Sequence, residues 1–421
     1  MARLNLNLRR PGSPVAEKTP LVLEPAERLE RPAARDGRPR AALLSVIVPT
    51  RNEAANVGPL VQRLDSALAG VDYELVFVDD SEDATPRLLE ELAASAGVRI
   101  AVRHRPPEQR ADGLAGAIIE GLGLASGDFV AVIDADLQHP PEILPQMLTR
   151  AFGRRADIVV ASRYVPGGSA AGLGTFSRRL ISQATRWFAR LLFHERLWSV
   201  QDPGSGFFIC RRELLSGIEL RPIGYKILME LLMRTSWSVL EEVPYTFEGR
   251  AGGVSKASLK QGMLFLRHAL RIFRELPTAG RVWKFLMVGA SGALVNLSVL
   301  WLLGVQFGLP GFIAWIGGLE MSLLSNCLLN RTFTWSDRRR SGLGGFAADV
   351  MRYHVAVAAG ILISTAGFTT FSLLGAPLLV AGLGGIALGA FANYLGCDNL
   401  VFRRRRTATV LPATSDPERA L

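Results

Sequence analysis

Short apolar runs alternate with helix-like stretches through the first half of the chain. Runs rich in β-branched and aromatic residues predict buried strands at residues 43–49, 74–79, 98–102, 129–134 and 157–161. Amphipathic stretches between them predict helices at residues 56–69, 85–95 and 113–124. Strands that alternate with helices predict an α/β fold on a mostly parallel, Rossmann-like sheet. Such sheets bind ligands at the carboxyl ends of their strands.

The pattern changes after residue 256. Residues 257–276 place Leu266 and Leu270 on one helical face, and Arg267 and Arg274 on another. A basic amphipathic helix beside membrane spans is typical of the membrane interface, although an ordinary surface helix would show the same pattern. Long apolar stretches follow, each near the ~20 residues that cross a bilayer, at residues 285–307, 312–329, 355–374 and 377–395.

Arginines indicate the orientation of these spans. They follow the second and the fourth span, at Arg331, Arg338, Arg339, Arg340, Arg352 and Arg403 to Arg406. The positive-inside rule places these segments and both termini in the cytoplasm. We therefore expect a multi-pass protein of the cell membrane with its soluble half in the cytosol.

These patterns predict an ordered series of segments. They are a disordered cytosolic tail (1–41), an α/β domain (42–256), an interfacial helix and linker (257–280), a four-span domain (281–403) and a basic cytosolic tail (404–421).

Charge and cysteine content exclude two other classes of protein. The net charge of +10 would also suit nucleic acid, but the basic residues gather at membrane boundaries without an interleaved aromatic platform. The cysteines Cys210, Cys327 and Cys397 lack the spacing of a disulfide framework or a zinc site. Oligomeric state leaves no signal in the sequence.

An acidic motif directly follows the strand predicted at residues 129–134. Asp134 and Asp136 stand two residues apart, and Gln138 adds a carbonyl oxygen. Hard oxygen ligands of this kind bind Mg²⁺ or Mn²⁺ and leave room for phosphate oxygens. A cation held there would neutralise the diphosphate that leaves a nucleotide-sugar. We predict a metal site at Asp134, Asp136 and Gln138.

Polar residues also end the first two strands and face the same edge of the sheet. We predict that they help to bind a nucleotide-sugar, together with Asp134 and Asp136, and they are Pro49, Arg51, Glu53, Asp79, Asp80 and Ser81. Ser81 can equally cap a helix, and the two roles are compatible.

Cationic residues follow later strands. Arginine binds phosphate through a planar fork, and a lipid-phosphate acceptor would need such a cradle near the membrane. The candidates for this cradle are Arg163, Arg178, Ser182, Arg250 and Lys256.

Several motifs, taken in order over residues 42–260, resemble dolichyl-phosphate mannosyltransferases, which are family 2 glycosyltransferases of the GT-A fold. The motifs are Asp79-Asp80-Ser81, Asp134 to Pro141, Ser162-Arg163-Tyr164, Ser205 to Phe208, Gly224-Tyr225-Lys226, and Glu242 to Lys256. The last third resembles the four-span GtrA-type membrane module. The resemblance implies an inverting transfer from GDP-mannose, or a related donor, to polyprenyl or dolichyl monophosphate.

The resemblance also implies roles for particular residues. Metal contact falls to Asp134, Asp136 and Gln138. Lipid-phosphate contact falls to Arg163, Arg178, Ser182 and Arg250, so that Asp136, Arg163 and Arg250 are the expected catalytic residues.

Two positions depart from the family pattern. Asp112 stands where a lysine often precedes the Gly-Leu-Gly segment, so a donor-phosphate contact is missing or is rebuilt from Arg110. Asp202-Pro203-Gly204 also replaces the usual residues before Ser-Gly-Phe.

The acceptor determines the chemistry that is needed. A phosphate monoester has its second pKa near 6 and is mostly a dianion at neutral pH, so it needs no general base. Catalysis can then depend on positioning and charge stabilisation. A sugar hydroxyl would need a carboxylate base, for which Asp202 and Glu230 are the candidates.

Other functions fit parts of the sequence. A UDP-glucose-dependent polyprenyl-phosphate glucosyltransferase would need the same machinery. Gln183 to Trp187 spells a signature of processive polysaccharide synthases, but it precedes Asp202 instead of following it. The spans could also belong to a non-enzymatic carrier of lipid-linked sugar, since Asn326 and Asn393 begin similar segments. Those segments indicate either a two-span repeat or polar helix packing.

Overall fold

The computed structural model describes residues 21–22, 44–221, 223–224, 226–249 and 259–403 of the 421-residue chain. The chain forms two compact units, Met1–Ile272 and Phe273–Leu421. Each unit is described by itself.

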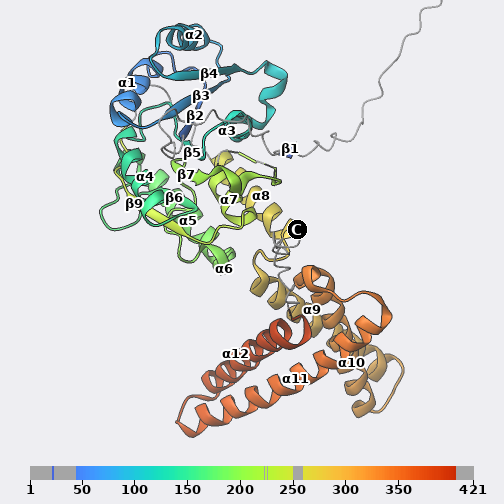
Figure 1. The fold of residues 1–421 in the computed structure, drawn as a ribbon. Helices are drawn as coiled ribbons and strands as arrows, with labels where there is room; N and C mark the ends of the chain where they lie inside the picture. Colours follow the sequence, from blue (N-terminus) through green and yellow to red (C-terminus); the bar gives the residue numbers. More distant parts are fainter. Residues whose placement is uncertain (1–20, 23–43, 222, 225, 250–258, 404–421) are drawn as a thin grey trace, which may run out of the picture. The chain divides into compact units, whose positions relative to one another are not determined.

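A seven-stranded sheet organises the first unit, in the order β4-β3-β2-β5-β7-β6-β9 (Figure 1). The strands are β2 (Leu44–Thr50), β3 (Tyr73–Asp79), β4 (Arg99–His104), β5 (Phe129–Val132), β6 (Ile158–Ser162), β7 (Phe208–Arg211) and β9 (Leu240–Pro244). Every strand predicted from the sequence is present, with small shifts at its ends. Residues of β2, β3, β5 and β6 are buried throughout, which explains their continuous apolar runs.

Helices connect the strands. They are α1 (Val57–Ala67), α2 (Thr85–Ser95), α3 (Gly113–Leu124), α4 (Leu144–Gly153), α5 (Phe176–Leu192), α6 (His194–Leu197), α7 (Ile227–Arg234) and α8 (Leu259–Glu275), with short 3-10 turns at η1 (Pro107–Asp112), η2 (Pro141–Ile143), η3 (Ala171–Leu173) and η4 (Arg212–Leu215). In α1, Val57, Leu60, Val61 and Leu64 are buried, because residues three and four positions apart share one helical face.

Strand β7 is the exception to the parallel order. It pairs antiparallel with both β5 and β6, so β5 and β6 run in the same direction. The carboxyl ends of β2, β3, β5, β6 and β9 consequently meet at one edge of the sheet. Thr50 pairs with Asp79 at this edge, and Ser162 pairs with Pro244.

A short strand lies within residues 1–41, which were predicted to be a disordered tail. Leu21–Val22 (β1) pairs antiparallel with Glu219–Leu220 (β8), so these two residues are ordered by backbone pairing. Residues 1–20, 23–43 and 404–421 lie outside the described part of the chain.

Over residues 273–403, the part of the second unit that the structure describes, four helices are long and apolar enough to cross a membrane, as predicted. They are α9 (Arg281–Trp301), α10 (Gly311–Leu329), α11 (Gly342–Leu373) and α12 (Leu378–Gly396), continued in three places by π-helices, η5 (Leu302–Gln306), η6 (Asn330–Thr334) and η8 (Cys397–Val401). A 3-10 turn, η7 (Ser336–Arg338), lies between α10 and α11. The chain is therefore a membrane protein.

The four helices form two hairpins with the same packing. A Cβ atom on Gly292 of α9 would collide with Asn326 of α10, and a Cβ atom on Gly360 of α11 would collide with Asn393 of α12. Each hairpin then ends in a π-helix, η6 or η8. Both explanations of the asparagine segments thus hold together: the hairpins repeat one arrangement, and the asparagines pack the helices.

Candidate active site

The acidic loop after β5 turns sharply between its two aspartates and Gln138. Leu137 adopts φ 60°, a left-handed conformation that costs energy for a residue with a branched side chain. The turn lets the Gln138 amide donate to Asp136 Oδ1 at 3.1 Å. Asp136 is buried, whereas the Asp134 side chain is 32% exposed.

A backbone bridge fixes the end of this loop. Gln138 Nε2 donates to the carbonyl of Glu248 at 2.9 Å, and the Glu248 amide donates to the Gln138 carbonyl at 3.0 Å. The bond from Nε2 orients the side-chain amide of Gln138. The side-chain oxygen, Oε1, can still accept a bond or bind a cation.

His139 anchors the loop in an aromatic cluster with Phe207, Tyr245 and Phe247. Its ring centroid lies 5.5, 5.8 and 5.4 Å from theirs, in that order. Burial lowers the pKa of His139 to about 4, so the ring is neutral at physiological pH. Its Nδ1 accepts a hydrogen bond from the Asp134 amide at 3.3 Å.

Gly206 leaves space beside the acidic loop. A Cβ atom there would lie 3.3 Å from Asp134 Oδ2 and 3.3 Å from the His139 ring. The Ser-Gly-Phe motif therefore allows the backbone before β7 to approach the Asp134 carboxylate closely.

Arg163 follows β6 and reaches the same aromatic cluster. Its guanidinium carbon lies 5.6 Å from the centre of the Phe247 ring, which also contacts His139. Its Nε and Nη2 atoms each donate to Asp202 at 2.8 Å. The structure thus brings the acidic loop and Arg163 together around Phe247.

Both candidate bases are occupied by cations. Asp202 accepts the two bonds from Arg163 and a third from the Arg163 amide at 3.1 Å. Glu230 accepts from Arg234 Nε at 2.8 Å, and its second oxygen lies 3.1 Å from His268 Nε2. Hydrogen bonds from His268 and other donors outweigh burial and lower the pKa of Glu230. Both carboxylates are thus held in ion pairs within the protein.

The residues predicted at the end of β3 form a network within the protein. Asp79 is fully buried and accepts from Thr50 at 2.7 Å and from Ser81 at 2.5 Å, while His104 Nδ1 lies 2.6 Å from its other oxygen. Asp80 forms a two-pronged ion pair with Arg105, at 2.7 and 2.5 Å.

The residues at the end of β2 differ in exposure. Pro49 lies inside the buried strand, Arg51 is exposed, and Glu53 accepts from Asn56 at 2.6 Å. The amide of Asn52 donates to Ser81 Oγ at 2.7 Å, which joins the ends of β2 and β3.

Arg110 also belongs to the β3 edge. Its Nε donates to the carbonyl of Arg105 at 2.8 Å, and its Nη2 lies 3.5 Å from the Ser81 carbonyl and 3.2 Å from His104 Nε2. The Arg110 guanidinium therefore lies beside the predicted donor site. It comes from the segment before Gly113, in which Asp112 stands where the family often has a lysine.

The predicted lipid-phosphate residues are only partly described. Ser182 on α5 hydrogen-bonds Tyr164, next to Arg163, with 2.7 Å between the hydroxyl oxygens. Arg178 lies about one helical turn earlier on α5 and is partly buried. Arg250 and Lys256 lie outside the described residues.

Sequence reasoning missed several members of the site. Arg105, His104 and Thr185 were not singled out, and His139 and Lys226 were read only as parts of longer motifs. Their partners lie on other strands or helices. The one local signal is a positive or imidazole side chain directly at the end of a strand, as in His104-Arg105.

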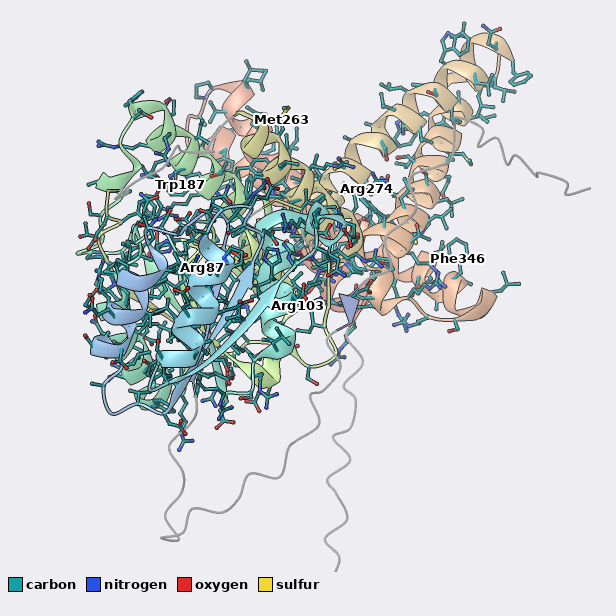
Figure 2. All side chains as sticks on the ribbon, turned by 90° about the horizontal axis from the view of Figure 1, so that it is seen from above. Arg87, Arg103, Trp187, Met263, Arg274 and Phe346 are labelled. Carbon is teal, nitrogen blue, oxygen red and sulfur yellow. The ribbon has the colours of Figure 1, made fainter. Side chains whose placement is uncertain are left out.

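Helices α5 and α8 expose a row of large apolar side chains on the first unit. Trp187 and Met263, labelled in Figure 2, are 49% and 66% exposed. The two helices meet at Phe188 and Phe265, whose ring centroids are 6.3 Å apart. On the opposite face of α8, Phe265 and His268 are buried. The helix therefore packs on the first unit with one face and exposes an apolar stripe on the other.

The acidic loop suits a divalent cation that shares its ligands with a phosphate. The described residues contain no cluster of three or more His, Cys, Asp or Glu side chains able to hold a metal alone. Mg²⁺ commonly binds through one or two carboxylates and completes its shell with water and substrate phosphates. Asp134 and Asp136 provide that number of carboxylates, and Gln138 adds a neutral oxygen.

Known proteins resemble both units of the chain. Residues 45–218 match "Glycosyl transferase family 2", and residues 284–409 match "GtrA/DPMS, transmembrane domain". A dolichol-phosphate mannosyltransferase of Pyrococcus furiosus is 39% identical over 84% of this chain and 97% of its own. That of Saccharomyces cerevisiae is 34% identical over 54% of this chain and 86% of its own.

A solved structure also shows a likeness. Glucosyl-3-phosphoglycerate synthase from Mycobacterium tuberculosis, in complex with Mn²⁺, UDP and glucosyl-3-phosphoglycerate, aligns with a TM-score of 0.41 at 22% identity. The alignment covers 55% of this chain and 78% of that one.

One family match lies within the first unit and the other within the second. The alignment with the Pyrococcus furiosus protein covers nearly the whole length of that protein. The chain belongs to the dolichol-phosphate mannosyltransferase family, as a family 2 glycosyltransferase of the GT-A fold with a GtrA/DPMS-type transmembrane domain.

Proposed function

We propose that the protein transfers mannose from GDP-mannose to the phosphate of a polyprenyl or dolichyl monophosphate, with inversion and with Mg²⁺ or Mn²⁺. One observation carries the proposal: the acidic loop and Arg163 pack against the same ring, Phe247, at one edge of the sheet. The names of the relatives support mannose as the sugar and dolichol phosphate as the acceptor.

In this proposal the acidic loop binds the donor diphosphate. Asp134 and Asp136, with Gln138, would hold the divalent cation, which when bound neutralises the charge of the leaving nucleotide. Asp79, Asp80 and Ser81 would shape the donor site, mainly through the hydrogen-bond network that joins β2 to β3. Pro49, Arg51 and Glu53 complete the donor edge, and Arg110 replaces the family lysine.

Arg163 would orient the acceptor phosphate. Its guanidinium has five N–H donors, and Asp202 receives two of them at 2.8 Å. The remaining donors can bind a phosphate while Asp202 keeps the fork in place. Arg178, Ser182, Arg250 and Lys256 are the further candidates, with Arg250 expected to act with Asp136 and Arg163 in catalysis.

The absence of a placed base favours a phosphate acceptor over a sugar hydroxyl. Asp202 and Glu230 are both occupied by cations in the described structure. A phosphate dianion attacks without losing a proton, so the arrangement is sufficient for it. A polysaccharide synthase transfers sugar to a hydroxyl and would need such a base, so the occupied carboxylates also oppose that function.

We further propose that α8, and α5 with it, lies at the cytoplasmic surface of the membrane. Their exposed apolar side chains and neighbouring arginines match an interfacial helix. The acceptor phosphate would then meet the site at the depth of the lipid headgroups.

A donor panel tests the proposal. Purified full-length protein in lipid nanodiscs receives GDP-mannose, UDP-glucose or related donors with polyprenyl phosphate and Mg²⁺ or Mn²⁺, and the lipid products are identified by mass spectrometry. We expect mannosyl-phosphoryl-polyprenol from GDP-mannose, and none after chelation. Preferential use of UDP-glucose would replace the donor assignment, and no lipid product from any donor would favour the carrier.

A further inference from the structure

Lys226 lies buried beside the ion pair of Arg163 and Asp202. Its side chain precedes α7, is only 9% exposed as a residue, and donates from Nζ to Thr185 Oγ1 at 3.0 Å. A cavity of about 10 Å³ is lined by Lys226, Arg163, Asp202, Thr185 and Ser182, among others. Such a cavity has room for about one water molecule. The lysine therefore shares a cavity with two of the candidate acceptor residues.

The charges around this cavity favour a dianion. Arg163, Arg186 and Lys226 line it with one carboxylate, Asp202. Arg186 donates to the backbone carbonyl and to the side chain of Gln201, each at 2.6 Å. These two bonds direct its guanidinium toward Gln201 and not toward Asp202. Two cations, Arg163 and Lys226, are left to face one carboxylate, so the cavity carries an excess of positive charge.

The position of Lys226 also fixes where its charge acts. The ammonium lies 4.6 Å from the centre of the Phe265 ring on α8, and a Cβ atom on Gly204 would lie 3.0 Å from Nζ. Glycine at 204 therefore gives the ammonium its place beside Asp202. A cation held between a ring and a hydroxyl keeps its charge at a defined point while its flexible stem allows small movements.

Resting on the proposed transfer to a lipid phosphate, we infer that Lys226 is a specificity-determining residue of the acceptor site. With Arg163 it supplies the paired positive charge that favours a phosphate dianion over a hydroxyl; because the cavity holds only about one water molecule, the phosphate would bind next to these two cations and not inside the cavity. The sequence analysis places Lys226 in a motif but gives it no such role, and residue 226 lies outside both family matches.

Affinity for the acceptor should depend on pH with a definite sign. Burial, helped by Arg163 and opposed by Asp202, lowers the pKa of Lys226 to about 8. The Lys226 side chain is a charged ammonium below that pH and a neutral amine above it. Affinity for the acceptor therefore falls as the pH rises through about 8.

Other charged and titratable groups lie in or around the cavity and behave differently. The Asp202 carboxylate beside Arg163 raises the pKa of that guanidinium against the effect of burial, so Arg163 keeps its charge. Burial raises the pKa of Tyr245, which faces Arg163, and lowers that of His139 to about 4. Burial also raises the pKa of Glu242, whose carboxylate accepts from the amides before and at Asp202. Of these groups, Lys226 is the one with a pKa near 8.

The test measures kcat and the KM for polyprenyl phosphate from about pH 6.5 to about pH 9.5, a range that brackets this pKa. We expect the wild-type KM to rise roughly tenfold across it, equivalent to about 1.4 kcal/mol. K226M should have the raised KM already at pH 7, with a flat profile. K226R should keep a low KM that no longer depends on pH, because arginine stays charged. The KM for the donor should not change in any variant.

Two further variants test whether the position of the Lys226 charge matters and whether loss of any positive charge has the same effect. G204A keeps the ammonium but displaces it, so we expect a smaller rise in the acceptor KM. R87M removes an exposed charge from α2, labelled in Figure 2, and should match the wild type.

The possible failures are distinguishable. A wild-type protein that makes no lipid-linked sugar would contradict the proposed function. A wild-type protein that transfers sugar, with K226M showing the same acceptor KM and pH profile, would overturn the role of Lys226. Equal loss of kcat in K226M and K226R, with no change in the acceptor KM, would make the lysine purely structural and would also overturn the inference.

Discussion

Asp136 is the buried member of the acidic pair after β5, and its charge is central to the proposed site. D136N keeps the shape of the side chain and its acceptor oxygen for the Gln138 amide, but removes the negative charge. We expect kcat to fall at least about 100-fold, because a lost charge at the leaving diphosphate weakens electrostatic stabilisation. The initial rate of lipid product formation measures it.

The matched control for D136N is E90Q, which neutralises an exposed carboxylate on α2. It should turn over at the wild-type rate. Thermal melting should coincide for both variants and the wild type. Wild-type turnover by D136N would remove Asp136 from the mechanism and favour the carrier function.

The ion pair between Arg163 and Asp202 allows structure and function to be separated. R163M leaves Asp202, which is 1% exposed, with less compensating charge, so we expect a loss of about 3 kcal/mol in the free energy of unfolding. The double variant R163M/D202L should recover most of that stability, because an apolar pair avoids the cost of a buried charge. It should not recover transfer.

Chemical denaturation and the transfer assay, run on the same preparations, check this pair of variants. Recovery of both stability and transfer in the double variant would show that Arg163 serves the fold alone. Failure to recover stability would show that the surroundings need the ion pair itself.

At the residue scale, candidate ligands can be proposed from the sequence more readily than their partners. Asp134 and Asp136 stand out as candidates because two carboxylates directly follow a predicted strand. The pairing of Asp80 with Arg105 was not, because it depends on how β3 and β4 align. Lys226 was equally hidden, since its cavity is assembled from segments far apart in the chain.

The repeated hairpins make a prediction at the scale of elements. G292A and G360A each place a methyl group against an asparagine of the partner helix, so each should lower the free energy of unfolding by about 1–3 kcal/mol through overpacking. G289A and G382A are the controls, because nothing lies within 4 Å of a Cβ atom at either position.

Thermal melting in detergent checks these four variants. The paired variants G292A/N326A and G360A/N393A should regain part of the loss, because the shorter side chain makes room. Equal melting of G292A and G289A would contradict the close packing of α9 on α10.

The exposed stripe of α8 makes a prediction about the membrane. A fluorophore attached to M263C should be quenched by brominated lipids in nanodiscs, whereas one attached to R87C on α2 should not. The native Cys210, Cys327 and Cys397 are all buried, so labelling can be directed to the new cysteine. Equal quenching at both positions, or none at residue 263, would contradict an interfacial α8.

Elements were predictable where periodicity was strong. Five strands, β2 to β6, and the four membrane spans were predicted from apolar runs alone, with ends displaced by a few residues except at α11, which begins at Gly342 and not at residue 355. Strands β7 and β9 were not predicted. Strand β7 is the short segment Phe208–Arg211, and its place between β5 and β6 is set by antiparallel pairing with both. Its presence is what leaves β5 and β6 parallel and their ends together.

Orientation belongs to the scale of the whole molecule. The arginines after α10 and after η8 predict a cytoplasmic location for these ends. A cysteine replacing Leu309, between α9 and α10, should react with an impermeant thiol reagent on intact cells. A cysteine replacing Ser341, before α11, should react only after permeabilisation.

The reverse labelling pattern would place the catalytic unit on the other side of the membrane. That result would contradict the proposed use of a cytosolic nucleotide-sugar, although it would leave the chemistry of the site unchanged. Composition predicts a soluble half and a membrane half; the chain forms two compact units, Met1–Ile272 and Phe273–Leu421.

The most direct test of the account is a structure of the full-length protein with Mn²⁺, GDP and a polyprenyl phosphate. We predict the cation within about 2.0–2.4 Å of oxygens from Asp134 or Asp136 and of a GDP phosphate, with the lipid phosphate on Arg163. A cation bound elsewhere, or a lipid phosphate remote from Arg163, would contradict it.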